Sequence, residues 1–523
     1  MIWILVLIAL LFAIWHYYVR LLSYWKNKGV RQSKPWLFLG DTWRLVYYKD
    51  EYSSKYLQWM YDMTRGGRYF GFYECSKPSL CVTDPELIKQ ITVKDFEYFQ
   101  DHSVNSIDPE IDYLFGSSLI SLKGEKWKHM RSTLSPSFTG SRMRIMYDLI
   151  HNVVDNVVKY FMEKNEDVVE VEMKDALTRY TNDVIASTAF GISVDSLTEK
   201  ANSFYLAGRR LFDVTGVFKT IEFLCIRSGP AFIAKLFGFK VIHDDEGTFF
   251  TRAIKEAIKV REEKKIIRPD MIHLLLESRK NKKNKDGILI GSGPTNPDNG
   301  MSDDEIASQS LVFFAAGFET VSQALTFGTY ELVANKDVQD RLREEIVDTY
   351  NKHGKPSIEV LLDMKYMDMV LSEILRKWPP LLETDRIVTK PYTIEPIDKT
   401  EVPVRLEPNT AVWLPIYAIH RAPENYPDPD RFDPERFSSE NKHMINQCTY
   451  MPFGSGPRFC IGNRLALTEI KSLLFELLLN FEIVPTEKTK IPANIISTNF
   501  THSFKDGNWL GLKRIKVKNQ ELP

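Results

Sequence analysis

The stretch Phe453-Gly454-Ser455-Gly456-Pro457-Arg458-Phe459-Cys460-Ile461-Gly462 constrains this chain more than any other part of it. Its cysteine stands alone, because Cys448 lies twelve positions upstream and no histidine follows at metal-ligand spacing. Zinc and iron–sulfur sites need several clustered ligands, whereas an axial thiolate on a haem iron needs one cysteine. An inert buried cysteine in a glycine-rich turn is the ordinary alternative. The combination of glycines, Phe453 and Arg458 around Cys460 favours the haem ligand.

The residues after this stretch predict a helix. From Asn463 to Phe475 the apolar residues recur at helical spacing, which places Cys460 at a helix N-terminus. Unpaired backbone N–H groups and the positive end of the helix dipole favour a thiolate there. Phe453 would shield the sulfur from water, and Arg458 would pair with a haem propionate.

The N-terminus predicts a membrane anchor. Residues 1–19 carry no charge, and 19 residues at a rise of 1.5 Å span about 28 Å, close to the thickness of a bilayer core. Basic residues follow and should stay cytoplasmic. The alternative is a cleaved secretory signal, but no basic region precedes the apolar run and no small-residue cleavage site follows it.

Composition excludes some classes of protein. The net charge of −1 gives no indication of nucleic-acid binding, so none is expected. Five scattered cysteines in 523 residues indicate a reducing compartment rather than a disulfide scaffold.

The pattern of elements changes along the chain. Residues 69–74 and 80–83 alternate like the strands of a hairpin, with Lys77-Pro78 between them, and Asp84-Pro85-Glu86 predicts the start of a helix. These features indicate a small β-rich lobe. From about Tyr147 to Glu277 the pattern is mostly helical. Within it, the apolar segment 214–242 is either a pair of core helices or a lid that dips into the membrane.

A long helix is predicted from Met301 to Ala334. Ser302 and Glu305 form a capping box at its start, and about 33 residues would span some 50 Å, enough to cross the protein. Its centre reads Ala315-Ala316-Gly317-Phe318-Glu319-Thr320. Small residues and a glycine there should weaken the helical ladder and leave a groove beside a carboxylate and a hydroxyl. By itself, a Gly-x-Glu-Thr pattern in a helix more often serves helix packing than catalysis.

Two further motifs lie downstream. Glu373 and Arg376 are spaced i,i+3 on a predicted helix over 368–377, and Phe432-Asp433-Pro434-Glu435-Arg436-Phe437 follows sixty residues later. A final strand is predicted over 509–517.

Together these motifs resemble the cytochrome P-450 monooxygenases, microsomal animal type, over nearly all of residues 31–517. The group includes insect detoxification and vertebrate drug-metabolising enzymes. The resemblance implies a mainly α fold with a smaller β-rich lobe (α+β), in which haem lies between the long oxygen-binding helix and the Cys460 loop. It also implies a transmembrane signal anchor over 1–20, a basic hinge linker over 21–45 and a haem-thiolate monooxygenase domain over 46–523.

The resemblance also implies roles for individual residues. Cys460 would be the axial ligand of haem b, Thr320 would steady dioxygen and its proton supply, and Glu319 would relay protons. The other residues expected to contact the haem are Phe453, Arg458, Trp127, Arg131, Arg386 and Ala316. Glu373, Arg376 and Arg436 would form a buried structural network.

The expected reaction inserts one atom of O2 into a small apolar substrate, a xenobiotic or a lipophilic endogenous compound. Electrons would come from NADPH through a separate membrane reductase, because the chain has no GxGxxG or flavin motif. The expected partners are NADPH–cytochrome P-450 reductase, docked near Lys128, Arg464 and Lys471, then cytochrome b5 and the lipid bilayer of the endoplasmic reticulum. Two alternatives are a haem-thiolate lyase or isomerase of this fold and a non-catalytic haem- or hydrophobe-binding protein.

Overall fold

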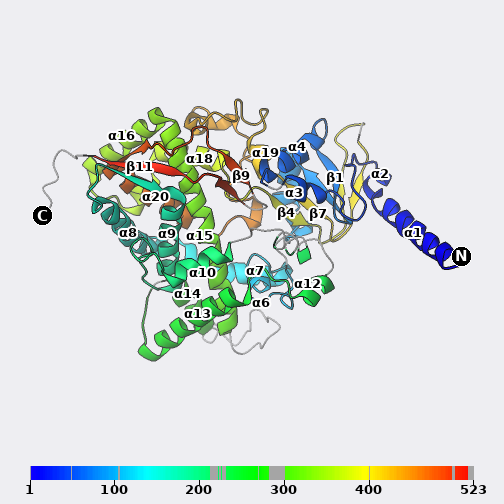
Figure 1. The fold of residues 1–523 in the computed structure, drawn as a ribbon, viewed down its shortest axis with the longest axis horizontal. Coiled ribbons are helices and arrows are strands. Elements are labelled where there is room, and N and C mark those ends of the chain that lie inside the picture. Colours follow the sequence, from blue (N-terminus) through cyan, green and yellow to red (C-terminus); the bar gives the residue numbers. More distant parts are fainter. Residues whose placement is uncertain are drawn as a thin grey trace.

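One long helix, α15 (Asp303–Ala334), runs through the molecule, and the other elements are packed around it (Figure 1). The computed structural model describes residues 2–515 except 49, 104–106, 213–218, 220–221, 223–224, 227–230, 269, 282–300, 400 and 498–500. Ser302 caps α15: its Oγ accepts from the Glu305 N–H at 3.1 Å, and its own N–H donates to Glu305 Oε2 at 2.8 Å. The predicted capping box is confirmed, and the helix begins two residues later than predicted.

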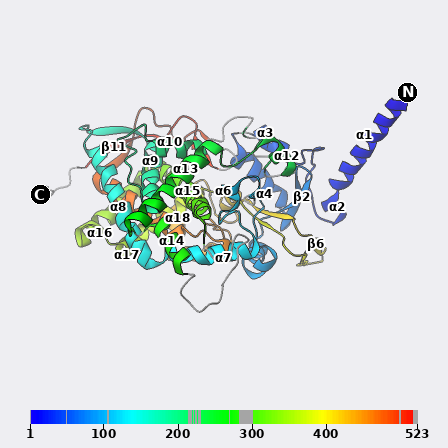
Figure 2. The same ribbon diagram turned by 90° about the horizontal axis from the view of Figure 1, so that it is seen from below.

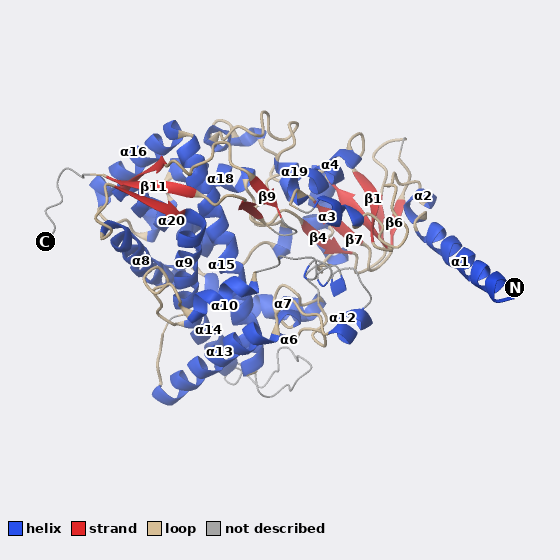
Figure 3. Ribbon diagram, viewed as in Figure 1, coloured by secondary structure: helices blue, strands red, loops and turns tan. Residues whose placement is uncertain are grey.

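Helices make up most of the body on the side away from the N-terminus (Figure 3). They are α7 (Gly124–Leu134), α8 (Gly140–Met162), α9 (Met173–Ile185), α10 (Ser203–Leu211), α13 (Asp244–Lys264), α14 (Met271–Asn281), α16 (Lys336–His353), α17 (Ile358–Leu362), α18 (Lys365–Lys377) and α20 (Asn463–Asn480).

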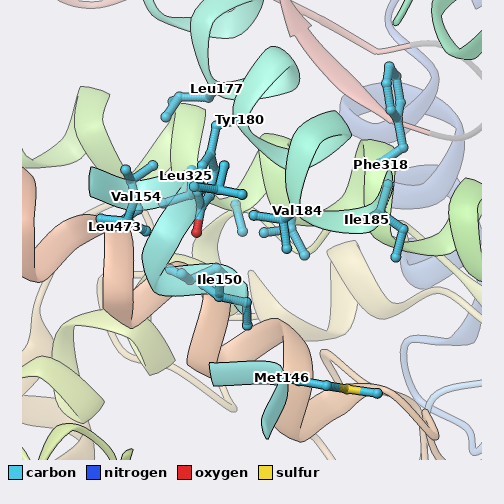
Figure 4. Packing of buried hydrophobic residues seen from close by; sticks show 14 of the residues in the cluster. Met146, Ile150, Val154, Leu177, Tyr180, Val184, Ile185, Phe318, Leu325 and Leu473 are labelled. Atoms are coloured by element: carbon cyan, nitrogen blue, oxygen red, sulfur yellow. The ribbon is translucent and has the colours of Figure 1, made fainter. Parts of the chain in front are cut away.

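The core of this body lies where α8, α9, α15 and α20 meet. Figure 4 shows Tyr180 and Val184 of α9 in one cluster with Val154 of α8, Leu325 of α15 and Leu473 of α20. All five side chains are buried. Burial of this kind stabilises a fold by about 25 cal/mol per Å² of apolar surface removed from water. The packing fixes α9 against the centre of α15, where the Ala-Gly-x-Glu-Thr motif lies.

A smaller lobe lies between the helical body and the N-terminal helix (Figure 3). Its four-stranded sheet has the order β1-β2-β7-β4, and β5 and β6 form a separate pair. The elements are α2 (Tyr24–Asn27), α3 (Trp43–Tyr48), α4 (Gln58–Thr64), β1 (Tyr69–Glu74), β2 (Lys77–Val82), α5 (Pro85–Lys89), β4 (Thr384–Ile387), β5 (Tyr392–Ile394), β6 (Val404–Leu406), β7 (Ala411–Leu414) and α19 (Ile416–His420). The predicted β-rich lobe is therefore present.

The turn of its first hairpin differs from the prediction. Lys77 and Pro78 belong to β2, where they pair with Glu74 and Tyr73 of β1. The turn is Cys75-Ser76 instead, and Cys75 has a φ of 53°. Pro78 is tolerated because the pairing of β2 with β7 begins only at Ser79. The predicted N-cap Asp84 is confirmed, because its side chain accepts from the Leu87 N–H at 2.8 Å.

The helix α1 (Ile2–Leu21) projects away from the body, as Figures 1 and 2 show. It is long and apolar enough to cross a membrane, and none of it is buried. α15 passes the same test of length and composition, but it is mostly buried inside the protein. Immediately after α1 the chain enters the β-rich lobe: Trp25 is fully buried against Gly71, where a Cβ would lie 2.2 Å from the indole Cγ.

A three-stranded sheet, β3-β11-β8, lies against the helical body. It contains β3 (Val168–Glu172), β8 (Phe481–Pro485) and β11 (Trp509–Arg514), and β9 (Ile495–Ser497) pairs with β10 (His502–Phe504) nearby. β3 interrupts the region predicted as mostly helical. Its partner β11 lies more than 330 residues further along the chain, so local pattern alone did not reveal the strand.

Most of residues 214–230, the first part of the apolar segment 214–242, lies outside the described residues. At its end, α12 (Ala231–Phe237) is described, and Phe232, Leu236 and Phe237 are exposed. The short helix α6 (Tyr113–Gly116) lies in the loop that precedes α7.

The three residues of the expected ion network meet in the interior. The Arg376 guanidinium donates twice to the Glu373 carboxylate, each time at 2.7 Å, and neither side chain is exposed. The Nε of Arg436 lies 3.4 Å from Glu373 Oε1. The N–H of Asp433 donates to the same oxygen at 2.9 Å. One buried carboxylate therefore compensates two guanidinium groups and joins α18 to the segment around 433–436.

Candidate active site

The loop before α20 is shaped by glycines and closed by a backbone hydrogen bond. The Cys460 N–H donates to the Phe453 carbonyl at 2.9 Å. Gly456 has a φ of 70°, and a Cβ there would lie 1.8 Å from the Thr92 carbonyl oxygen. Only glycine fits that position, because a side chain would meet rigid backbone. The loop therefore holds Cys460 in one place, three residues before α20 begins.

Cys460 lies deep in the protein and is exposed to an internal cavity of about 350 Å³. Burial raises the pKa of its thiol, while a hydrogen bond from the Gly462 N–H and the charge of Arg131 act in the opposite direction. The backbone donor expected from the helix start is thus present at the N-cap of α20. In the protein alone, burial is the larger effect and the pKa of the thiol is raised, while the hydrogen bond and the nearby positive charge favour the thiolate.

The cavity lies between α15, α7 and the Cys460 loop. Six of the residues singled out in the sequence line it besides Cys460: Phe453, Arg458, Trp127, Arg131, Ala316 and Thr320. Most of the remaining wall is apolar, with Leu119, Ile120, Phe138, Ile185, Val312, Phe313, Val321, Ala324, Leu375 and Leu382. Such a lining excludes water and accepts apolar molecules. Glu319 and Arg386 were also singled out, but they do not line this cavity.

Arg458 is held by three groups of the protein. Its guanidinium donates to the carbonyls of Gln100 at 2.8 Å and Leu122 at 2.9 Å, and to Asp101 Oδ1 at 3.2 Å. It also lies 4.0 Å from the centre of the Trp127 ring. A cation over an aromatic face is attracted by the ring quadrupole, so Trp127 helps to fix the guanidinium. Burial lowers the pKa of Arg458 to about 10, which leaves it charged at neutral pH.

Arg386 lies on β4 behind the cavity wall. It donates to the carbonyls of Asp385 at 2.6 Å and Ser455 at 2.9 Å, and thereby ties β4 to the Cys460 loop. Its Nε is buried and has no hydrogen-bond partner among the described residues. Burial lowers the pKa of Arg386 to about 10.

Two polar residues that sequence reasoning missed also line the cavity. His102 Nδ1 lies 3.0 Å from Asp385 Oδ1, and burial lowers the pKa of the imidazole. Glu469 of α20 is buried, its Oε1 has no partner within the described residues, and burial raises the pKa of its carboxyl group well above the usual range. His102 lies in a loop without a recognisable motif. Glu469 lies on α20 among many apolar residues, but that helix also contains Arg464, Lys471 and Glu476, so the sequence gives Glu469 no distinguishing signal.

The centre of α15 is an uninterrupted helix. The predicted weakening of the ladder at Gly317 does not occur, because Ile185 of α9 fills the space, with its Cδ1 2.9 Å from where a Cβ would lie. Thr320 faces the cavity, and its Oγ1 donates to the Ala316 carbonyl at 2.6 Å. Glu319 instead pairs with Lys174 of α9 at 2.8 Å.

Known proteins are similar to this chain over most of its length. The family profile described as Cytochrome P-450 matches residues 32–504. The chain is 41% identical over 526 residues to cytochrome P-450 9e2 of Blattella germanica, covering 97% of this chain and 96% of that protein. It is 38% identical over 510 residues to probable cytochrome P-450 9f2 of Drosophila melanogaster, covering 94% and 95%. It is 35% identical over 498 residues to cytochrome P-450 6k1 of Blattella germanica, covering 94% and 93%.

The chain belongs to the cytochrome P-450 family. It is a monooxygenase, and membership of the family implies haem and the use of O2.

The residues around the cavity fit a P-450 haem. Cys460 is the one thiol among the described residues that line the cavity, and an axial thiolate requires one. Within the described part of the chain, no group of three or more His, Cys, Asp or Glu side chains could hold a bare metal ion. Trp127, Arg131 and Arg458 offer donors for the acidic edge of the macrocycle. Bound there, the haem would supply oxygen activation, which amino-acid side chains cannot provide.

Proposed function

We propose that this cytochrome P-450 oxidises small apolar compounds, xenobiotics above all, with electrons from NADPH delivered by a separate membrane reductase. The observation that carries the proposal is that Cys460 and Thr320 face one apolar cavity from opposite elements, the loop before α20 and the middle of α15. The names of the insect relatives give only family membership, so the substrate class rests on the lining.

Each residue has a defined part in this proposal. Cys460 would supply the thiolate that binds the haem iron, and Phe453 would shield the sulfur from water. Trp127, Arg131 and Arg458 would hold the haem propionates, and Arg386 would support them through its contact with the Cys460 loop.

On the other face of the cavity, Ala316 leaves space beside the haem. Thr320 steadies dioxygen and passes on protons, and Glu319 brings protons from solvent. The Thr320 hydroxyl suits that part, since it lines the cavity and already donates along the helix. The apolar wall excludes water, which limits the release of unused reduced oxygen.

The reductase is proposed to dock beside the start of α20. Arg464 is exposed there, and Lys128 of α7 is exposed and pairs with Glu125 at 2.7 Å. Lys471 does not belong to this surface: it is buried, donates to the carbonyls of Leu361 and Leu362 and pairs with Asp368 at 2.5 Å. The prediction that the reductase docks near Lys471 is therefore wrong. The Lys471 ammonium group instead links α20 to the end of α17. Cytochrome b5 is proposed as a second partner at the same surface.

The proposed location is the endoplasmic reticulum membrane, with α1 as the anchor and the catalytic domain on the cytoplasmic side. α1 is an apolar helix of which no residue is buried. Basic residues from Arg20 onward follow it, which favours the cytoplasmic side for the body.

The test is the carbon monoxide difference spectrum of the reduced, purified protein. A strongly red-shifted Soret band is expected for the wild type and for C448S, a matched control in which a nearby free cysteine is removed. C460S should lose that band. A wild-type band at the position of ordinary haem proteins would contradict the thiolate assignment. NADPH consumption that stays absent after addition of the reductase would contradict the electron source.

A further inference from the structure

A histidine that does not line the cavity connects the end of α18 to the segment that leads into the Cys460 loop. His420 is the last residue of α19, and its side chain is fully buried. Its Nδ1 lies 3.1 Å from the carbonyl oxygen of Arg376, and its Nε2 lies 2.9 Å from the backbone nitrogen of Met451. One imidazole ring therefore contacts the backbone of two segments that are far apart in the sequence.

The two backbone partners fix the protonation of the ring. A backbone N–H group can only donate, so Nε2 carries no proton and accepts from Met451. A carbonyl oxygen can only accept, so Nδ1 carries the proton and donates to Arg376. Burial and the charge of Arg376 lower the pKa of His420 to about 3, so this neutral form persists at physiological pH.

Arg376 holds His420 from the other side. The Arg376 Nη1 donates to the His420 carbonyl at 3.1 Å, while its Nε and Nη2 donate to Glu373 at 2.7 Å each. The side chain of each residue thus contacts the backbone of the other. The carboxylate that orients the guanidinium therefore also fixes the backbone of His420.

Tyr450 fixes the orientation of the imidazole ring. The two rings are stacked, with their centres 5.7 Å apart and their planes at 20°. The Tyr450 hydroxyl donates to the Ser372 carbonyl at 3.1 Å, one residue before Glu373 in α18. Packing against Tyr450 keeps Nε2 directed at the backbone of the next residue, Met451.

Met451 begins the turn that enters the Cys460 loop. The Met451 carbonyl accepts from the Gly454 N–H at 3.1 Å, and the Phe453 carbonyl accepts from the Cys460 N–H at 2.9 Å. His420 holds the N–H of the first residue of this turn. A short series of hydrogen bonds therefore leads from His420 to the residue that carries the sulfur.

We propose that His420 is a positioning residue for the Cys460 thiolate. By accepting from the Met451 N–H, it fixes the start of the loop and thereby the place of the sulfur. This inference rests on the proposed function, in which Cys460 is the axial ligand. If His420 only filled space in the core, its two hydrogen bonds would be of equal importance to the sulfur. In a positioning role the bond to Met451 matters most, because it is the one that reaches the loop.

The test uses the full-length enzyme with its haem, and two amide side chains separate the hydrogen bonds. In H420N the amide nitrogen takes the place of Nδ1, so the donor to Arg376 is kept and the acceptor for Met451 is lost. In H420Q the amide oxygen takes the place of Nε2, so the acceptor is kept and the donor is lost. Y147F is the matched control, because it removes another buried hydrogen bond to a carbonyl, that of Tyr147 to Pro356 at 2.6 Å.

Two readouts report the position of the loop, and neither is turnover. In the carbon monoxide difference spectrum of the reduced protein, H420N should lose at least half of the strongly red-shifted band to the position of ordinary haem proteins. H420Q and Y147F should keep the wild-type spectrum. Amide hydrogen exchange of the peptide spanning residues 448–460 should become about ten-fold faster in H420N, the value of one hydrogen bond, and should stay unchanged in H420Q.

The outcomes separate this inference from the proposed function. Equal losses in H420N and H420Q, including failure of both to fold, would refute the positioning role, because the two bonds would then be equivalent. A wild-type spectrum for H420N with exchange equal to that of Y147F would refute it as well, while the thiolate assignment would stand. If the wild type itself lacks the red-shifted band, the proposed function fails, and the inference fails with it.

Discussion

Replacing Glu373 by glutamine should destabilise the protein far more than replacing an exposed glutamate. Glu373 and Arg376 are both fully buried, and the carboxylate receives hydrogen bonds from Arg376 and the Asp433 N–H, with Arg436 at 3.4 Å. Glutamine has the same shape, so no cavity forms and the change is one of charge. It leaves two guanidinium groups without a counter-charge in the interior.

The magnitude follows from the geometry. Removing one partner of a buried ion pair costs about 3–5 kcal/mol, because the remaining charge stays buried. The entropy of unfolding is about 2.1 cal/mol/K per residue, or about 1.1 kcal/mol/K for the 523 residues. The melting temperature of E373Q should therefore fall by about 3–5 °C.

The assay is thermal unfolding followed by circular dichroism, with the haem-to-protein ratio measured on the same samples. The matched control is E359Q, because Glu359 pairs with Arg144 at 2.5 Å but both side chains are more than half exposed. Exposed pairs contribute little, so the control should melt with the wild type. If E373Q also melts with the wild type, the buried carboxylate does not compensate the two arginines and the assigned network is refuted.

Three further predictions concern other parts of the molecule. Burial lowers the pKa of His420 and of His502 to about 3, so both stay neutral when folded, whereas the unfolded chain protonates them below about pH 6.5. Stability should therefore be lost as the pH falls from about 6.5 toward 3, by up to about 2.7 kcal/mol per pH unit from the two together, and H502Q should lower the slope measured in melting experiments by about 1.4 kcal/mol per pH unit. R464E should raise the reductase concentration needed for half-maximal NADPH consumption without lowering the melting temperature. K471E should instead lower the melting temperature, because Lys471 is buried. If R464E and the wild type show equal kinetics at low salt, the docking surface is excluded. H102L removes the hydrogen bond between His102 Nδ1 and Asp385 Oδ1 in the cavity wall, so it should transfer haem to apomyoglobin about ten-fold faster, the value of one hydrogen bond to a charged group; an unchanged rate would show that this bond does not help to retain the haem.

Local chemistry made much of the fold and site predictable. The capping box of α15, the N-cap of α5 and the glycines of the Cys460 loop each act within a few residues, so their positions could be inferred from sequence. The i,i+3 spacing of Glu373 and Arg376 is also a local feature that can be inferred from the sequence. Motif residues such as Trp127 and Arg131, four apart on α7, also line the same cavity.

Contacts between distant segments were not predictable in this way. β3 is a strand because β11 pairs with it, and no local pattern shows that partner. Lys174 lies 145 residues before Glu319, and His102 meets Asp385 across 283 residues. The prediction that Lys471 belongs to the docking surface was wrong for another reason. α20 is buried on nearly all sides, so a lysine in its middle has to find partners inside the protein.

The join between α1 and the β-rich lobe leaves no free length of chain. α1 ends at Leu21, Leu22 is already buried, and Trp25 is wedged against Gly71. With α1 in a bilayer, the body would not move freely on a flexible linker. It would keep a fixed height and a fixed tilt relative to the membrane surface. Lipophilic molecules dissolved in the membrane would then meet the same face of the enzyme at every encounter.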